Sequence, residues 1–523
     1  QRLDPAPASF SCAESCAHPN LCGYGKAVLE EVLRQGVKAL LLVDCCDVCR
    51  RVYDVLARQG DMDFLFLMAL PHKNGPGEVD VLTRELARLT AELARYTGRS
   101  LEDAAALESW RASAEQLPRE GMEEPHLLLT GAHGGSLLLE MIRERVSLPV
   151  VDDTCTGQRL LPPPEGSFSP EGYARALLDQ KSPCMRMQFR WEQPDPAALG
   201  VICHTVKFCD YYGFQYRHLR EERSVPLLKI ETDCTPQSSG QLRTRIDAFA
   251  EALQPGASGG SAGARRRYAA GVDSGSASTD AVVLDSEKNI LGWALLPTGA
   301  GAAAGAEKAL SQALAQAGLT REDLDGLVTT GYGRETVGLA GSSVTEITCH
   351  AKGAHFLCPE ARTVIDIGGQ DSKVIRLDPE GNVESFAMND KCAAGTGRFL
   401  EMMARTLELT LPEMAQRGLH WKKPVTISSM CTVFAESEVV SLVAENVAPE
   451  DIIHGLNAAV AEKTVSLVRR ASGMPVYVMT GGVAKNQGVV QALEEKLGQP
   501  VWVPREAQLC GALGAALFAL EGK

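Results

Sequence analysis

The sequence predicts an α/β protein built from two units of that class and a flexible linker. From residue 26 to residue 247, helical patterns alternate with short apolar runs, which is typical of parallel sheets covered by helices. A stretch rich in Gly, Ser and Ala at 253–267 has no apolar periodicity and predicts a tether. We therefore expect one domain at 1–252 and a second at 268–523, separated by this linker.

Short apolar runs mark the expected strands of the first domain. Three of them lie at residues 37–43, 63–68 and 126–131. Two more runs, at 148–151 and 225–230, contain Pro149 and Pro226 near their beginnings. Because proline lacks a backbone N–H, we expect these two runs at strand starts or sheet edges. The second domain is expected to begin with a strand, a turn and another strand at 268–284.

Composition and charge narrow the class of protein. The chain has 523 residues, enough for roughly three compact units. Its net charge of −14 disfavours nucleic-acid binding, which depends on Lys and Arg clusters. No apolar run approaches the roughly 18–20 residues of a membrane helix. No export signal is visible, and the adjacent Cys45 and Cys46 favour metal ligation over disulfides for the 16 cysteines. We expect a cytoplasmic metalloprotein with neither a nucleic-acid nor a membrane partner.

Three turns of small residues, at 271–280, 364–372 and 478–486, each follow an apolar run and would allow backbone N–H groups to approach phosphate oxygens. In this order they resemble the two phosphate loops and the adenosine loop of the acetate kinase/sugar kinase/Hsp70/actin superfamily. The resemblance implies a two-lobed actin-like ATPase that closes over ATP or ADP, with Asp273 and Asp366 acting on Mg²⁺ and Gln370 orienting the attacking water. The implied nucleotide-binding residues are Gly275, Ser276, Ser278, Thr279, Gly368, Gly369, Gly481 and Gly482.

Further segments narrow this resemblance. Residues 330–334, 346–353, 389–399 and 431–438 are similar to segments of the activator ATPases of 2-hydroxyacyl-CoA dehydratases. Asp280 departs from that pattern, because activators often carry Lys at this position.

Two cysteines of the second domain, Cys392 and Cys431, precede helical patterns. A helix N-terminus stabilises a thiolate, which suits ligation of an iron–sulfur cluster. Since two cysteines cannot fill the four sites of a 4Fe–4S cluster, a second subunit should supply the other two. We therefore expect a homodimer that shares one 4Fe–4S cluster; the alternative is that both cysteines are small buried hydrophobic residues.

Five cysteines of the first domain lie in loop-like contexts, several of them at strand ends. They are Cys22, Cys46, Cys155, Cys184 and Cys209. Loops at the carboxyl ends of parallel strands converge on one crevice, where gathered thiolates could hold a cluster. The segments around them resemble the subunits of 2-hydroxyacyl-CoA dehydratases and the double-cubane cluster proteins, and an N-terminal portion of the usual subunit is expected to be absent.

The number of thiolates distinguishes the clusters that this resemblance implies. Three would suit a 4Fe–4S site with one open iron, and more would suit a double cubane of the 8Fe–9S type. Five matching positions favour the larger cluster with its sixth ligand undetermined. The alternative is that most of these cysteines are structural, as we expect for Cys234. The spare cysteines are Cys12, Cys16, Cys45, Cys49 and Cys203.

The first functional hypothesis is an ATP-gated reductase fused to its electron acceptor, supplied by an external low-potential donor such as ferredoxin or flavodoxin. The second is a 2-hydroxyacyl-CoA dehydratase fused to its activator. The third is a sugar-kinase-like transferase with incidental cysteines, which would contain no iron.

Overall fold

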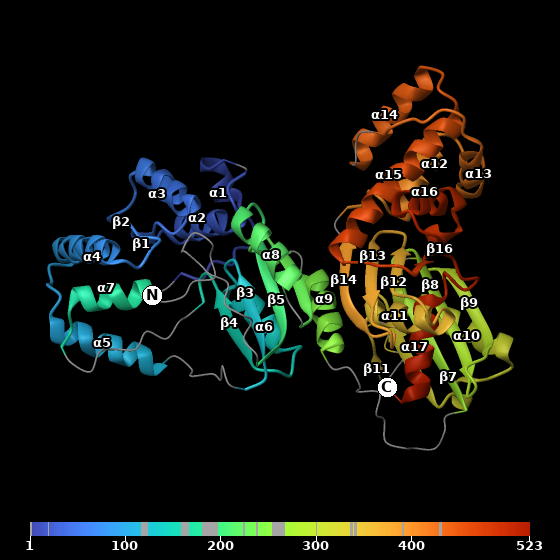
Figure 1. The fold of residues 1–523 in the computed structure, drawn as a ribbon, viewed down its shortest axis with the longest axis horizontal. Helices are drawn as coiled ribbons and strands as arrows, with labels where there is room; N and C mark the ends of the chain where they lie inside the picture. Colours follow the sequence, from blue (N-terminus) through green and yellow to red (C-terminus); the bar gives the residue numbers. More distant parts are fainter. Residues whose placement is uncertain are drawn as a thin grey trace. The chain divides into compact units, whose positions relative to one another are not determined.

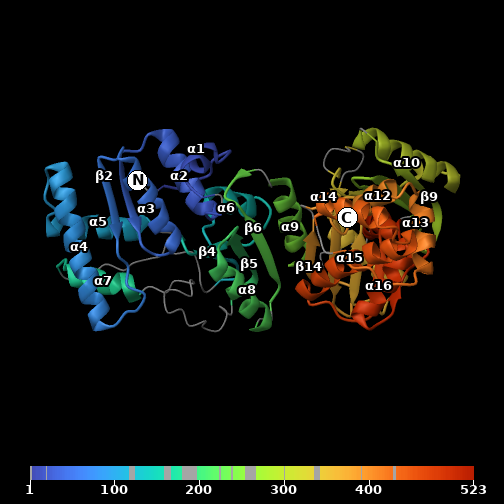
Figure 2. The same cartoon turned by 90° about the horizontal axis from the view of Figure 1, so that it is seen from above.

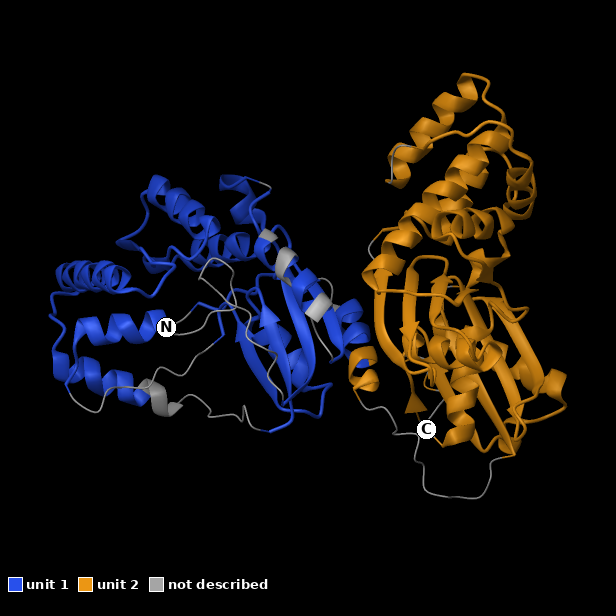
Figure 3. Ribbon diagram, viewed as in Figure 1, with its two compact units in different colours: residues 1–247 blue, residues 248–523 orange. Residues whose placement is uncertain are grey.

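The computed structural model divides the chain into two compact units, residues 1–247 and residues 248–523 (Figure 3). The predicted linker at 253–267 lies outside the described residues, apart from Leu253 and Arg267. The structure describes residues 3–18, 20–116, 124–157, 167–179, 197–222, 225–236, 239–253, 267–299, 301–334, 338, 342–389, 392–427 and 431–522. Among these, no helix has the length and apolar character needed to cross a membrane.

The first unit contains two parallel sheets where the apolar runs suggested one (Figure 1). One is two-stranded, and the other has four strands in the order β4-β3-β5-β6. The strands are β1 (Ala39–Val43), β2 (Phe64–Met68), β3 (His126–Gly131), β4 (Val150–Thr154), β5 (Ala198–Val206) and β6 (Leu227–Thr232). The helices are α1 (Ser11–Cys16), α2 (Gly23–Gln35), α3 (Asp47–Gln59), α4 (Pro76–Thr97), α5 (Asp103–Gln116), α6 (Gly135–Arg143), α7 (Pro170–Asp179), α8 (Asp210–Glu222) and α9 (Ser239–Ala252), the last of which crosses the unit boundary.

Two prolines of this unit lie where the sequence predicts. Pro149 directly precedes β4 and Pro226 directly precedes β6, and these are the two edge strands of the four-stranded sheet. The smaller sheet is accompanied by its own helices. Val79 and Leu82 of α4 pack against Ala174 of α7, so these two helices lie side by side (Figures 1 and 2).

The second unit contains two five-stranded sheets of the same design, each with three antiparallel strands followed by two parallel ones. The first has the order β11-β10-β7-β8-β9 and the second β14-β13-β12-β15-β16. Their strands are β7 (Tyr268–Ser274), β8 (Ser278–Asp285), β9 (Ile290–Pro297), β10 (Gly326–Thr330), β11 (Ser342–Ser343), β12 (Thr363–Ile367), β13 (Ser372–Leu377), β14 (Val383–Asn389), β15 (Tyr477–Thr480) and β16 (Val501–Trp502). The helices are α10 (Ala302–Ala317), η3 (Arg321–Asp323), α11 (Glu346–Leu357), α12 (Gly397–Thr406), α13 (Leu411–Arg417), η4 (Gly418–His420), α14 (Thr432–Ala444), α15 (Pro449–Arg470), η5 (Gly482–Lys485), α16 (Gln487–Leu497) and α17 (Cys510–Glu521).

Small residues let α17 approach its neighbours closely. A Cβ at Gly271 of β7 would lie 2.1 Å from the carbonyl oxygen of Ala512, and one at Gly514 would lie 1.8 Å from that of Cys349. Real Cβ atoms do not approach so closely, so glycine is required at both contacts. This packing holds β7 and α11 in a fixed relation, and both elements carry residues of the cleft described next.

Candidate functional site

Three glycine turns of the second unit line one cleft of about 1030 Å³. The first two are built alike: the N–H of Gly275 donates to the carbonyl of Ser278, and the N–H of Gly368 donates to that of Asp371, both at 3.0 Å. The third begins at Gly481, whose φ of 84° lies in the left-handed region. A Cβ there would lie 2.5 Å from the carbonyl oxygen of Ile367 in β12.

Most of the predicted nucleotide-site residues line this cleft. They are Asp273, Gly275, Ser276, Ser278, Asp366, Gly368, Gly369, Gly481 and Gly482. Two predicted residues are not among its lining: Thr279 is buried with its hydroxyl 3.0 Å from that of Thr298, and Gln370 is exposed in the turn between β12 and β13.

Two carboxylates face the cleft from neighbouring strands. Asp273 of β7 and Asp280 of β8 are cross-strand partners. One carboxylate oxygen of each is buried without a hydrogen-bond partner in the described part of the chain. Buried acceptors of this kind suit a hard divalent cation such as Mg²⁺, which binds through carboxylate oxygens and water.

Asp280 occupies the position at which the similar activators often carry Lys. Its environment favours the protonated, neutral form of the carboxyl group. Burial, followed by the nearby charge of Asp273, raises the pKa of Asp280 to about 8. In the nucleotide-free and metal-free protein, the carboxyl group therefore remains neutral at pH 7. The stability that depends on this neutral form is present below its unfolded pKa and is lost as the pH rises through about 8.

We expect Asp280→Asn to remove this loss of stability. The free energy of unfolding of the variant minus that of the native chain should be about 1–3 kcal/mol higher at pH 9 than at pH 5, because the amide cannot ionise. Urea denaturation at both pH values, without nucleotide and metal, measures the difference. Asp285→Asn, at the half-buried end of the same strand, is the control and should show no such gain. A constant difference across this pH range would contradict the assignment.

A buried lysine organises the acidic residues around the cleft. The side chain of Lys373 is 1% exposed, and its Nζ lies 2.6 Å from Glu346 Oε1, 3.0 Å from Asp371 Oδ2 and 3.3 Å from Asp366 Oδ2. Burial disfavours its charge, but the three carboxylates outweigh burial and raise its pKa. Asp371 also accepts a hydrogen bond of 3.0 Å from the hydroxyl of Tyr332.

His350 of α11 lies between Asp273 of the first five-stranded sheet and Asp366 of the second. Its Nδ1 lies 3.5 Å from Asp366 Oδ1 and its Nε2 lies 3.7 Å from Asp273 Oδ2. Burial opposes protonation, but the charge of Asp366, followed by the side-chain interaction with Asp273, prevails and raises the pKa of His350. Side-chain atoms of Asp273, Glu346 and His350 gather within 4.8 Å of one another. All three side chains line the cleft.

No sequence pattern predicted a role for Lys373, Glu346, His350 or Asp371. The available signal was spacing: Glu346 and His350 are four residues apart, which places them on one face of α11. Lys373 and Asp371 are two apart at the start of β13, but the strand alone does not show that a lysine points inward.

The two cysteines expected to bridge subunits are exposed in the second unit. Cys431 is the N-cap of α14, as the helical pattern predicted. Cys392 is separated from α12 by residues 393–396, and Thr396 is the N-cap of that helix. Of the two thiols, only that of Cys431 therefore lies at a helix N-terminus.

Cysteines of the first unit gather at the carboxyl edge of the four-stranded sheet. Cys155 follows β4 and Cys209 follows β5. Cys234 follows β6 and packs with Cys209 in one cluster. Cys22 precedes α2, whose first residue, Gly23, donates to the carbonyl of Lys207 in the loop after β5. Burial is the main factor that raises the pKa of Cys22. Cys184 lies outside the described residues.

Cys46 belongs to a second group of thiols, at the start of α3. Its sulfur lies 3.7 Å from that of Cys49, and Cys45 lies 3.8 Å from Cys49. Hydrogen bonding with Cys45 and then Cys49, together with the backbone N–H groups of Cys49 and Val48, lowers the pKa of Cys46. The sequence predicts no cluster-ligand role for Cys45 and Cys49, the two neighbours of Cys46 in this group.

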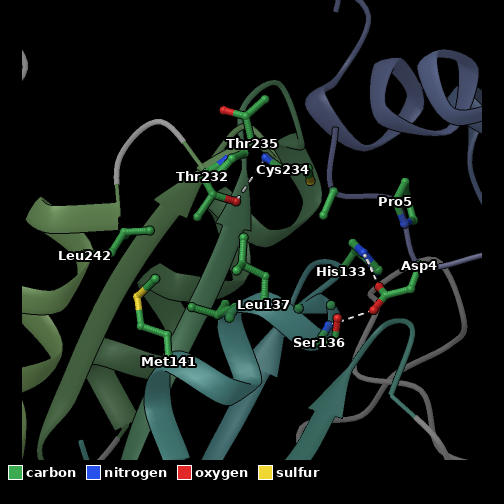
Figure 4. A pocket seen from close by; sticks show the side chains of 15 residues that line it. Asp4, Pro5, His133, Ser136, Leu137, Met141, Thr232, Cys234, Thr235 and Leu242 are labelled. Carbon is green, nitrogen blue, oxygen red and sulfur yellow. Dashed lines mark hydrogen bonds and ion pairs between the residues drawn. The ribbon is translucent and has the colours of Figure 1, made fainter. Parts of the chain in front are cut away.

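A small pocket of about 40 Å³ lies at the same sheet edge, beside the beginning of α6 (Figure 4). Asp4 is one of its lining residues; its Oδ2 accepts a 2.8 Å hydrogen bond from the N–H of Ser136, and its Oδ1 lies 3.3 Å from His133 Nε2. Its volume is too small for a substrate of ordinary size.

Two sheets of one design, with glycine turns and buried carboxylates lining a shared cleft, define a two-lobed, actin-like ATPase fold in the second unit. The chain belongs to the BadF/BadG/BcrA/BcrD ATPase family, whose model matches residues 270–519. The family model of the 2-hydroxyglutaryl-CoA dehydratase D-component matches residues 3–124 and 104–253. These matches confirm the combination that the sequence motifs predict.

Relatives of known name match the ATPase half. The activator of lactoyl-CoA dehydratase from Anaerotignum propionicum is 50% identical over 254 residues, which is 49% of this chain and 98% of that protein. The 2-hydroxyisocaproyl-CoA dehydratase activator from Clostridioides difficile is 44% identical over 254 residues, 49% of this chain and 95% of that protein. The crystal structure of (R)-2-hydroxyglutaryl-CoA dehydratase component A from Acidaminococcus fermentans has 45% identity and a TM-score of 0.47, covering 49% of this chain and 98% of that one.

Proposed function

We propose that the chain hydrolyses ATP in the cleft of its second unit and thereby delivers a low-potential electron to a metal centre in its first unit. The observation that carries this proposal is the pairing of the two domains in one chain: a nucleotide-type cleft follows a sheet with cysteines at its carboxyl edge. A small-molecule acceptor would receive the electron. ATP drives a change of conformation and phosphorylates no substrate.

In the cleft, the three glycine turns bind the phosphates and the adenosine, and Asp273 and Asp366 hold Mg²⁺ or its waters. The unpartnered buried oxygen of Asp273 supports this role. Asp366 is held in place by Lys373 and by the hydroxyl of Thr480, which donates to its Oδ1 at 2.9 Å. Gln370 would orient the attacking water, which requires the exposed turn that carries it to close over the nucleotide.

Cys392 and Cys431 would hold a 4Fe–4S cluster together with the same two residues of a second copy, which makes the active form a homodimer. Their exposure fits this role, because a ligand shared between subunits must be reachable from outside its own chain. Such a cluster supplies one-electron transfer at low potential. α12 and α14, which follow these cysteines, would transmit closure of the cleft to the thiolates.

In the first unit, Cys22, Cys46, Cys155 and Cys209 are the described candidates for a second iron–sulfur cluster. Cys22, Cys155 and Cys209 are supported by their shared position at one sheet edge. With Cys184, the set would suit the larger double-cubane type. An external donor such as ferredoxin or flavodoxin would supply electrons in the cytoplasm.

The test is whether ATP gates reduction of the first unit. With a strong reductant present under anaerobic conditions, EPR should show rapid reduction of the N-terminal cluster only when MgATP is added. A nonhydrolysable analogue should support at most one transfer per site. Cys22→Ser/Cys155→Ser, which lacks ligands of that cluster, identifies its signal. Equal reduction rates with and without nucleotide would contradict gating.

The match to a dehydratase D-component favours one second candidate, a 2-hydroxyacyl-CoA dehydratase fused to its activator. Conversion of a 2-hydroxyacyl-CoA to the enoyl-CoA by the reduced protein in the presence of ATP would support this function. ATP-dependent reduction of the N-terminal cluster without such conversion would support the reductase.

A further inference from the structure

A hydrogen bond connects the two lobes of the second unit, each of which is built on one of its five-stranded sheets. Tyr332 lies in the turn after β10 of the first sheet, and Asp371 lies in the turn between β12 and β13 of the second. The hydroxyl of Tyr332 donates to Asp371 Oδ2 at 3.0 Å. Both residues line the cleft, so the two lobes meet here at the proposed nucleotide site.

The turn that carries Tyr332 packs on the first glycine turn. The N–H of Gly333 donates to the carbonyl of Ser274 at 3.1 Å. Gly331 has a φ of 86°, and a Cβ there would lie 2.5 Å from both the carbonyl oxygen of Ser274 and Asp273 Oδ1. The position of Tyr332 is therefore tied to the first phosphate turn.

The turn that carries Asp371 also carries Gln370. The carbonyl of Asp371 accepts the N–H of Gly368 at 3.0 Å, and its Oδ2 lies 3.0 Å from Lys373 Nζ. Asp371 is buried, whereas Gln370, which directly precedes it, is exposed. Asp371 is thus the anchored end of a turn that must move to bring Gln370 over the nucleotide.

We propose that Tyr332 is a positioning residue for ATP hydrolysis, which holds Asp371 from the opposite lobe and thereby aligns Gln370 with the attacking water. The inference rests on the proposed function, in which Gln370 orients that water. Burial, followed by the negative charge of Asp371, raises the pKa of Tyr332, so its hydroxyl remains a donor throughout the neutral pH range. Phenylalanine at this position would keep the ring and lose only the hydrogen bond.

The test compares Tyr332→Phe with the native full chain in steady-state hydrolysis of MgATP. The value of kcat should fall about tenfold, as expected for loss of one hydrogen bond to a charged acceptor. Because the alignment matters in the transition state, KM and the affinity for a nonhydrolysable ATP analogue should change by less than about twofold. The affinity for ADP with aluminium fluoride, which imitates the transition state, should fall with kcat.

Tyr477→Phe is the matched control. It removes a hydroxyl from β15, outside the cleft lining, and should keep the native kcat. Circular dichroism verifies that each variant is folded. An equal loss of kcat in both tyrosine variants would overturn the inference, and so would a loss of analogue affinity as large as the loss of kcat.

A double variant tests the route through Gln370. If Tyr332 acts by aligning Gln370, adding Tyr332→Phe to Gln370→Ala should lower kcat by less than about twofold further. Additive losses, or a native kcat in Tyr332→Phe, would overturn the inference, while slow hydrolysis in Gln370→Ala would leave the proposed function standing. A native chain that hydrolyses no ATP would instead overturn the proposed function, and this inference with it.

Discussion

Lys373→Met should destabilise the second unit by about 3–5 kcal/mol, the range measured when one partner of a buried ion pair is removed. Its ammonium group neutralises Glu346, Asp366 and Asp371 in the protein interior. Without it, these carboxylates remain buried with His350 as the nearby cation among the described residues. Urea denaturation followed by circular dichroism measures the loss.

The pH dependence of this loss has a defined sign. Burial is the largest effect on Glu346 and raises its pKa to about 7, while the charge of Lys373 opposes that rise. Removing the lysine raises the pKa of Glu346 further. A carboxyl group whose pKa is raised in the folded state contributes stability at a pH below its unfolded pKa, and this contribution is lost as the pH rises through the folded pKa. The loss of stability caused by Lys373→Met should therefore be larger at pH 9 than at pH 5.

Lys352→Met is the matched control. Lys352 pairs with Glu521 at 2.8 Å, but its side chain is 33% exposed, so the loss should stay within about 1 kcal/mol. Adding Glu346→Gln to Lys373→Met should recover part of the stability, because one uncompensated charge is removed. Equal losses in the two lysine variants, or no recovery in the double variant, would contradict the charge-balance explanation.

Cys392→Ser and Cys431→Ser should each abolish the shared cluster of the proposed homodimer. Each substitution removes one ligand from each subunit, leaving two of four thiolates. We expect loss of the cluster EPR signal, loss of about four irons per dimer, and a shift toward monomer in light scattering.

Nucleotide binding should persist in both variants, since neither cysteine lines the cleft. This separates loss of the cluster from misfolding. Cys358→Ser, a partly buried cysteine of the same unit, is the control and should keep cluster and dimer. Native-like spectra and mass in both cysteine variants would refute the bridging role.

Short-range patterns were sufficient to predict the elements that form the cleft. The glycine turns could be located because glycine after a strand marks a tight turn, and Pro149 and Pro226 marked edge strands because proline removes a backbone donor. The N-cap position of Cys431 followed from the helical pattern after it. All of these signals act over a few residues.

What the sequence by itself determined was therefore the class of each unit and the order of its nucleotide turns. Tertiary structure alone decided which distant side chains meet. Lys373 reaches Glu346 across 27 positions of sequence, and the strand pattern does not show that a charged residue faces inward. The split of the first unit into two sheets and the convergence of Cys45, Cys46 and Cys49 were likewise undetermined. Strand pairing and side-chain direction depend on packing between segments far apart in the chain, and local propensity carries no information about that packing.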